Sequence, residues 1–222
     1  DIVAKSPADG YTVHWTTASG FLYNPFFYKS VSYDVLKDFT PISAVIDAPI
    51  STVVHASVPV NNVTQLVDYA KRNPGKLNCG SFGIGSSGHL NMEMFQTLSG
   101  AKLTHVPYKG ATPALTDVMA GHIQMMFISV GSAVPQWKSE KVKFIAVGAG
   151  KRMQLLPDMP TVAESGLPGY EAQSWFGLFG PAGMAPDVVD KINAEVRVLH
   201  NEAAKYHYDW AEEIVLDLTN GR

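Results

Sequence analysis

Residues 1–58 alternate short apolar runs with turn signals. Residues 11–17, 42–46 and 51–56 are rich in β-branched and aromatic side chains and are short enough for buried strands. Asp47-Ala48-Pro49 separates the second run from the third, and proline lacks the N–H that a strand ladder uses. The pattern therefore predicts three short strands in this part of the chain.

The hydrophobic period becomes helical at Val63. Val63, Leu66, Val67 and Ala70 lie at helical spacing, and Asn73-Pro74-Gly75 ends the helix. Strands and helices then alternate, with strands expected over residues 76–81, 102–107, 123–127 and 144–147, and helices over residues 87–98, 112–120 and briefly after Gly131. Such alternation favours an α/β fold with a mostly parallel sheet that carries helices on its faces.

The last part of the chain is expected to belong to the same lobe as the first part. Residues 174–179 have the composition of a strand, and Pro186 opens an amphipathic helix. With 222 residues the chain is long for one average domain. We expect two α/β lobes, one built from residues 1–58 and 171–222 and the other from residues 59–170.

Composition and charge exclude several classes of protein. Hydrophobic residues make up 46% and charged residues 17%, which is typical of packed cores and not of a disordered chain. The net charge of −3 and the absence of a Lys/Arg run argue against a nucleic-acid partner. No apolar stretch approaches the roughly 18 to 20 residues that span a bilayer. The chain opens at Asp1 without methionine or signal peptide, and we expect that an N-terminal portion precedes it.

Cys79 is the only cysteine, so the chain forms no intrachain disulfide. This suits the cytosol and equally a bacterial periplasmic protein without bridges. A single cysteine beside a strand is usually a small buried hydrophobic residue, and we expect that role here.

The segment from Cys79 to His89 carries the strongest functional signal. It contains four glycines, at positions 80, 83, 85 and 88, between an expected strand and an expected helix. Ser86 and Ser87 bring hydroxyl groups to the start of that helix, where unpaired N–H groups and the positive end of the helix dipole favour an anion. The loop therefore predicts a carboxylate or phosphate site.

Two other interpretations of this loop stay open. Gly83-x-Gly85-x-x-Gly88 matches a dinucleotide fingerprint, although the next strand ends in Tyr108-Lys109 without the acid that binds a ribose hydroxyl. Lys109 could accept a 2′-phosphate, so an NADP-dependent oxidoreductase is the alternative function. The loop could also serve packing alone.

Catalytic and metal-binding patterns are scarce. The seven histidines form no H-E-x-x-H pair, and no Cys–His metal spacing or G-x-S-x-G elbow occurs. His105 lies in a strand pattern and is expected to be a hydrogen-bonded interior residue, whereas His89 on the first turn of the helix is a candidate to lie near a ligand. We expect no metal and no cofactor.

Several segments together resemble one family. They are Pro7-Ala8-Asp9-Gly10-Tyr11-Thr12, Tyr33-Asp34-x-x-Lys37-Asp38-Phe39-Thr40-Pro41-Ile42, Ala70-Lys71-x-Asn73-Pro74-Gly75-Lys76-Leu77-Asn78, His105-Val106-Pro107-Tyr108-Lys109-Gly110, Leu156-Pro157-Asp158-Met159-Pro160-Thr161-Val162-Ala163-Glu164 and Ser174-Trp175-Phe176-Gly177-Leu178 with Pro181-Ala182-Gly183. From about residue 5 to 198 the chain resembles the extracytoplasmic solute receptors of tripartite tricarboxylate transporters, the Bug proteins.

The resemblance implies a two-lobed periplasmic-binding-protein fold of the Venus-flytrap type II class, without enzymatic activity. Such a receptor is periplasmic and monomeric, takes a small organic acid between its lobes and delivers it to membrane permease subunits. A sensor that signals to a membrane partner would use the same lobes.

The resemblance also assigns binding residues. On the second lobe it implies a carboxylate loop with Ser81, Gly83, Gly85, Ser86, Ser87 and His89. On the first lobe Thr16, Thr17 and Ser19 match a loop that faces the cleft. Ser129 follows a strand where the family commonly has an aspartate, and its hydroxyl can still donate a hydrogen bond.

The sequence departs from the family at both ends. Members usually begin with a strand and a Pro/Gly-rich loop that closes over the ligand, and this sequence starts after both. The residues after Leu199 no longer resemble the family.

Overall fold

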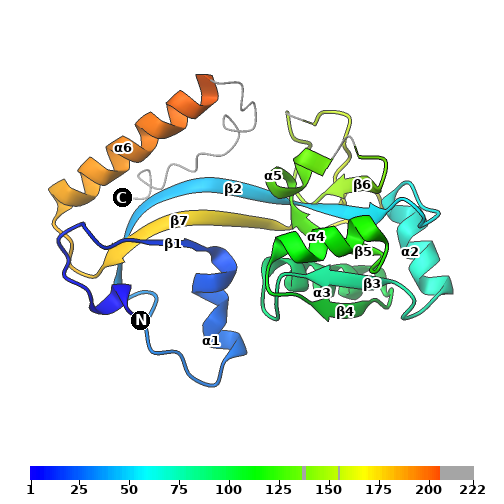
Figure 1. The fold of residues 1–222 in the computed structure, drawn as a ribbon, viewed down its shortest axis with the longest axis horizontal. Coiled ribbons are helices and arrows are strands. Elements are labelled where there is room, and N and C mark those ends of the chain that lie inside the picture. The colour runs from blue at the N-terminus through cyan, green and yellow to red at the C-terminus, as the bar shows by residue number, and fades with distance from the viewer. Residues whose placement is uncertain (137–138, 155, 206–222) are drawn as a thin grey trace. The chain divides into compact units, whose positions relative to one another are not determined.

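The computed structural model describes residues 1–136, 139–154 and 156–205 and divides the chain into two compact units (Figure 1). Unit 1 consists of Asp1–Asp47 and Trp175–Arg222, and unit 2 of Ala48–Ser174. The chain thus changes units at residues 47/48 and 174/175, compared with 58/59 and 170/171 expected from the sequence. Strands β2 (Phe39–His55) and β7 (Gln173–Pro181) each run across one of these boundaries.

Unit 1 is built around an antiparallel strand pair and a group of aromatic side chains. Strand β1 (His14–Thr17) pairs with β7, with His14 opposite Phe179. The ring centroid of the buried Phe21 lies 4.9 Å from that of Phe39 and 4.4 Å from that of Phe179. The other elements are the 3-10 helix η1 (Val3–Lys5), the π-helical turn η2 (Ser19–Tyr23), and the helices α1 (Asn24–Phe27) and α6 (Pro186–Lys205).

Strand β1 is shorter than the expected strand over residues 11–17. The backbone N–H of Tyr11 donates to Asp9 Oδ1 at 3.1 Å, and Gly10 has a positive φ of 87°. This turn takes up the residues before His14, because an Asp side chain that bonds two residues on offers the backbone an alternative to a strand ladder.

Strand β2 is continuous, and the expected break at Asp47-Ala48-Pro49 is wrong. The residue before a proline favours extended backbone, so Ala48 is already compatible with a strand. Proline itself is tolerated in a strand where its nitrogen does not have to donate to the ladder. One long strand therefore replaces the two that were expected.

In unit 2, β2 lies between β6 (Val142–Val147) and β5 (Met125–Ser129), and β5 is followed by β3 (Asn78–Ser81) and β4 (Thr104–Pro107). Strand β3 is parallel to β4 and β5, whereas β2 is antiparallel to β5 and β6. The sheet is therefore mixed: β3, β4, β5 and β6, which include the strands that a helical crossover connects, run in one direction, and among these five strands β2 alone runs the other way. The expectation of a mostly parallel sheet thus holds for four of the five strands. Strand β2 is not joined to either neighbour by such a crossover, so nothing requires it to be parallel to them.

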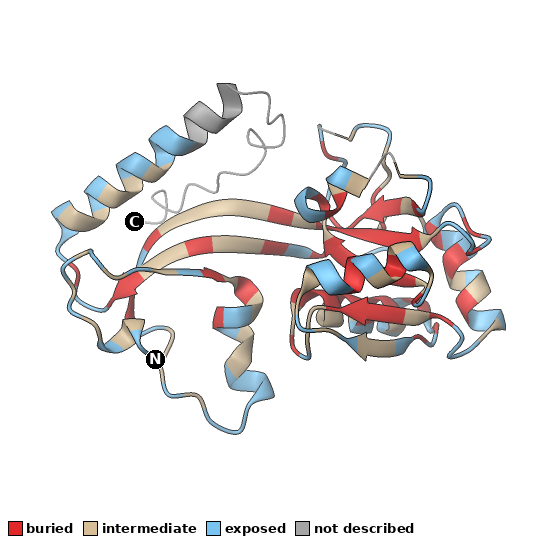
Figure 2. Cartoon of the chain, in the orientation of Figure 1, coloured by how far each residue is buried: buried red, intermediate tan, exposed pale blue. Residues whose placement is uncertain are grey.

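Helices cover both faces of this sheet, as expected. They are α2 (Val63–Arg72), α3 (Ser87–Ser99), α4 (Ala111–Ala120), the short α5 (Val130–Ala133) and the 3-10 turn η3 (Val134–Gln136). The central strand β5 alternates strictly: Met125 and Phe127 belong to the apolar cluster of α2 and α3, while Met126 and Ile128 belong to that of α4. Both clusters are buried, as Figure 2 shows for the strands of this unit.

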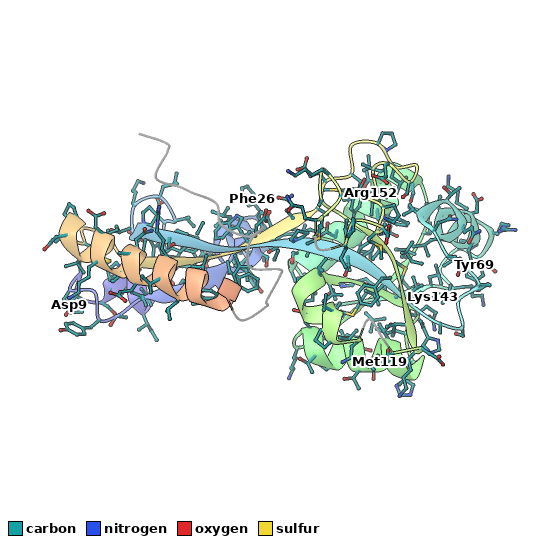
Figure 3. All side chains as sticks on the ribbon, turned by 90° about the horizontal axis from the view of Figure 1, so that it is seen from above. Asp9, Phe26, Tyr69, Met119, Lys143 and Arg152 are labelled. Atoms are coloured by element: carbon teal, nitrogen blue, oxygen red, sulfur yellow. The ribbon has the colours of Figure 1, made fainter. Side chains whose placement is uncertain are left out.

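Two long cationic side chains, labelled in Figure 3, anchor connections of unit 2. Lys143 Nζ donates to the carbonyl of Val58 at 2.6 Å. Arg152 donates to Glu164 Oε1 at 2.7 Å and to the carbonyl of Pro157 at 3.1 Å. Arg152 thereby ties together the connection between β6 and β7, and Lys143 ties β6 to the turn after β2.

Helix α6 includes the start of the segment after Leu199 for which we expected a departure from the family, and residues 206–222 lie outside the described residues. No helix in the part of the chain that the structure describes is long and apolar enough to cross a membrane.

Candidate functional site

The glycine loop lies at the carboxyl end of β3, between that strand and helix α3. Gly83 and Gly85 have positive φ angles of 130° and 79°, a region that other residues rarely adopt. Because β3, β4 and β5 are parallel, their carboxyl ends meet at one edge of the sheet, where ligands of α/β proteins commonly bind.

The loop is closed by hydrogen bonds to one carbonyl group. The oxygen of Gly83 accepts from Ser81 Oγ at 3.1 Å, from Ser86 Oγ at 2.6 Å and from the backbone N–H of Ser86 at 3.2 Å. Ser86 is also the N-cap of α3, since its Oγ accepts from the N–H of His89 at 3.4 Å. Both polar groups of Ser86 are thus used inside the loop, which gives this residue a structural role that the sequence did not predict.

The first two N–H groups of α3 are available to bind an anion. In the described part of the chain no acceptor lies within hydrogen-bond distance of the N–H of Ser87 or of Gly88. Ser87 is buried, and its hydroxyl has no partner among the described residues either. A carboxylate at this position would receive three hydrogen bonds and the favourable end of the helix dipole.

Gly88 is required by a close approach of the backbone. A Cβ at this position would lie 2.9 Å from the carbonyl oxygen of Phe127 and 2.8 Å from the ring of Phe82. The start of α3 therefore packs directly against β5, which holds the free N–H groups near the carboxyl end of that strand.

Two histidines support the loop from one side. The rings of His89 and His105 stack with centroids 4.1 Å apart and planes 10° from parallel. His105 Nε2 lies 2.6 Å from Ser81 Oγ, and burial, followed by the neighbouring His89, lowers the pKa of His105. His105 is partly buried and hydrogen-bonded, as the sequence predicted, but its contact with Ser81 depends on the register of β3 and β4.

Ser129 ends β5 at the same edge of the sheet. Its hydroxyl donates to Ser132 Oγ at 2.8 Å, so in this structure it closes the turn into α5. The backbone of Ser129 is paired with Ile50 of β2.

The residues expected from the first lobe lie together in unit 1. Thr17 Oγ1 is 3.1 Å from Ser19 Oγ and accepts from the N–H of Gly20 at 3.2 Å. Thr16 is buried, and its hydroxyl reaches the carbonyl of Thr17 at 3.5 Å. The end of β1 and the turn after it therefore carry three neighbouring hydroxyl groups.

Unit 1 also contains a pocket of about 440 Å³, which no pattern in the sequence predicted. It is lined by polar and aromatic side chains, among them His14, Asn24, Tyr33 and Phe39. Only the aromatic content of residues 21–39 could have indicated a cavity there, and aromatic residues equally form cores.

Metal chemistry has no support in the described residues, because they contain no group of three or more His, Cys, Asp or Glu side chains able to hold an ion. Lys109 follows β4 without an acid beside it, as the sequence indicated, so the ribose contact of a dinucleotide site has no carboxylate at that strand end.

Two α/β units and a glycine loop with free N–H groups at a strand end are typical of proteins that bind small solutes. Residues 1–207 match the protein family described as the tripartite tricarboxylate transporter family receptor. The chain belongs to this family.

Known proteins of similar sequence and structure agree with this assignment. A UPF0065 protein in the tcbD-tcbE intergenic region of Pseudomonas sp. (strain P51) is 39% identical over 197 residues, covering 88% of this chain and 58% of that protein. R. palustris Rpa4515, solved with adipate, superimposes with a TM-score of 0.84 at 37% identity, covering 88% of this chain and 65% of that one. MatC from Rhodopseudomonas palustris, solved with bound malate, superimposes with a TM-score of 0.81 at 29% identity. The match covers 90% of this chain and 68% of that one. The chain thus spans less than two thirds of the length of the first two relatives.

Proposed function

We propose that this protein is a solute receptor that binds a small dicarboxylate through the loop of residues 81–89. The observation that carries the proposal is the start of α3, where the N–H groups of Ser87 and Gly88 and the Ser87 hydroxyl lack an acceptor in the described part of the chain. No cationic side chain is needed, because helix N-terminal donors bind a carboxylate on their own.

The relatives support a dicarboxylate as the ligand. Rpa4515 was solved with adipate and MatC with malate, and both molecules carry two carboxylate groups. In the proposal, Ser81, Gly83, Gly85, Ser86 and His89 shape the loop that holds one carboxylate, and Ser129 lies at the same sheet edge. Thr16, Thr17 and Ser19 are proposed as a second group of ligand-binding residues, in unit 1.

The rest of the proposal is supported by the family assignment and by the charge of the chain. The receptor acts outside the cytoplasm, in the periplasm, as a monomer without catalytic activity, and passes its ligand to membrane permease subunits. It has no nucleic-acid partner and needs no cofactor.

A thermal-shift series tests the proposal. The chain is melted with adipate, malate, a monocarboxylate and a tricarboxylate, and with NADPH to represent the alternative oxidoreductase. A ligand that binds only the folded state stabilises it by about 2.7 kcal/mol at a hundred times its Kd. We expect the dicarboxylates to raise the midpoint in a concentration-dependent way; a shift with NADPH alone would support the oxidoreductase instead.

A pair of serine variants locates the site. Ser87→Ala removes the hydroxyl group of a buried residue at the start of α3, and we expect it to weaken dicarboxylate binding by about 1–3 kcal/mol. Ser99→Ala is the matched control, because it removes a buried serine hydroxyl at the opposite end of the same helix. Equal affinities of the two variants would exclude the Ser87 hydroxyl from the site.

A further inference from the structure

His89 bonds the glycine loop in a way that depends on its protonation. The backbone N–H of Gly85 donates to His89 Nδ1 at 3.2 Å, so this nitrogen carries a lone pair and no hydrogen. In a neutral imidazole the hydrogen is then on Nε2, which lies 3.7 Å from Glu93 Oε1. A second proton has only Nδ1 as its site, where it would meet the N–H of Gly85.

The position of His89 is also held by contacts other than its bond to Gly85. Its ring stacks on His105, and His105 is bonded through Nε2 to Ser81, the residue at which β3 ends. His89 also follows the N-cap Ser86 by three residues, with its own N–H bonded to that cap. The imidazole is therefore set by α3 and β4, and Gly85 is the partner that can move.

We propose that His89 is a positioning residue that holds the glycine loop in its binding conformation only while its imidazole is neutral, so that acid releases Gly85 and weakens carboxylate binding. The link to binding rests on the function proposed above, whereas the release of Gly85 does not.

The groups that face His89 set the balance of this switch. Glu93, from the same helix, is the nearest anion and favours a proton on His89. His105, from β4, opposes a second positive charge across a 4.1 Å stack.

Two variants separate the hydrogen bond from the charge. In His89→Asn the amide oxygen takes the place of Nδ1 and can accept from Gly85, but the side chain does not titrate. In His89→Leu both the acceptor and the charge are lost. Neither the bond nor its pH dependence should survive in the leucine variant, while the asparagine variant should keep the bond at every pH.

The first measurement needs no ligand. The amide resonance of Gly85 is followed by NMR from pH 8 to pH 5, together with the ring resonances of His89. We expect the Gly85 amide to shift with the same midpoint as the His89 ring in the wild type and to stay constant in His89→Asn. The amide of Gly100, which is bonded to Gln96 at the other end of α3, is the internal control for folding.

The second measurement is the affinity for adipate at pH 8 and at pH 6. We expect binding by the wild type to weaken about three- to tenfold, the equivalent of one lost hydrogen bond, and that of His89→Asn to stay constant. The asparagine variant carries the same ligand titration, so any change in the ionisation of adipate cancels.

The outcomes distinguish the two proposals. A Gly85 amide that ignores the titration of His89, or an asparagine variant with the same pH dependence as the wild type, overturns the role of His89. Absence of adipate binding at pH 8 in every variant counts against the proposed function, and the amide titration still decides the switch.

Discussion

The hydroxyl of Tyr108 donates a hydrogen bond of 2.6 Å to Asp117 Oδ2 and so ties the residue after β4 to helix α4. The N–H of Tyr108 donates at 2.9 Å to the carbonyl of Ser81, the last residue of β3. Tyr108 thus connects the start of the glycine loop to α4, which packs on the face of the sheet opposite to α3. The hydrogen bond from Tyr108, together with His122, lowers the pKa of Asp117, and burial and the same carboxylate raise the pKa of Tyr108 to about 12.

Replacing Tyr108 by phenylalanine should raise the pKa of Asp117 towards its ordinary value. A carboxylate with a lowered pKa in the folded state stabilises the fold above its unfolded pKa, and that contribution is lost as pH falls through the folded value. The wild type should therefore exceed Tyr108→Phe in unfolding free energy at pH 6, and the difference should shrink below about pH 4. Denaturant unfolding at several pH values measures this.

The matched control for this prediction is Tyr69→Phe, on α2, whose hydroxyl has no hydrogen-bond partner among the described residues. Its stability difference from the wild type should be independent of pH. A pH-independent difference for Tyr108→Phe as well would mean that the bond to Asp117 contributes nothing to the acid stability.

Gly88→Ala should destabilise the protein, because the new Cβ meets the backbone oxygen of Phe127, which cannot move aside as a side chain can. Overpacking of this kind costs about 1–3 kcal/mol. Gly131→Ala is the control: within 4 Å of its added Cβ nothing lies in the described part of the chain, so its stability should be unchanged or slightly higher. Equal melting temperatures of the two variants would show that α3 does not approach β5 as closely as this structure has it.

Cys79 should resist alkylation while the protein is folded. Its side chain is buried in the core under α3, and burial raises the pKa of the thiol, which removes the reactive thiolate. Iodoacetamide should label it slowly in buffer and rapidly in denaturant, as mass spectrometry would record. Rapid labelling of folded protein would contradict the burial of β3.

Helix ends were the most predictable part of the fold. The helices expected over residues 87–98 and 112–120 end at Gly100 and Gly121, and both glycines adopt the left-handed backbone conformation, with φ of 70° and 78°, that glycine alone adopts freely. The ends of the strands were harder to predict, because a strand ends where its partner strand ends. The strand expected from residue 76 begins only at Asn78, opposite Thr104 of β4, and the proline at residue 49 does not interrupt β2.

The candidate site was predictable in position but not in its internal bonds. Glycines after a strand and serines before a helix indicated an anion-binding loop from local chemistry alone. That Ser86 would cap the helix, and that His89 would stack on His105, depends on the loop conformation and on the β3–β4 register. Residues that are far apart in the chain leave no trace of such a contact in a single sequence.

The most direct test of the account is an NMR titration of the protein with adipate at pH 8, read at the amides of Ser87 and Gly88. The amides of Ala111 and Thr112, at the start of α4 in the same unit, are the internal control. We expect saturable shifts of the Ser87 and Gly88 amides, with little change at α4. Saturable binding that leaves these two amides unmoved would contradict the assignment of the carboxylate to the glycine loop.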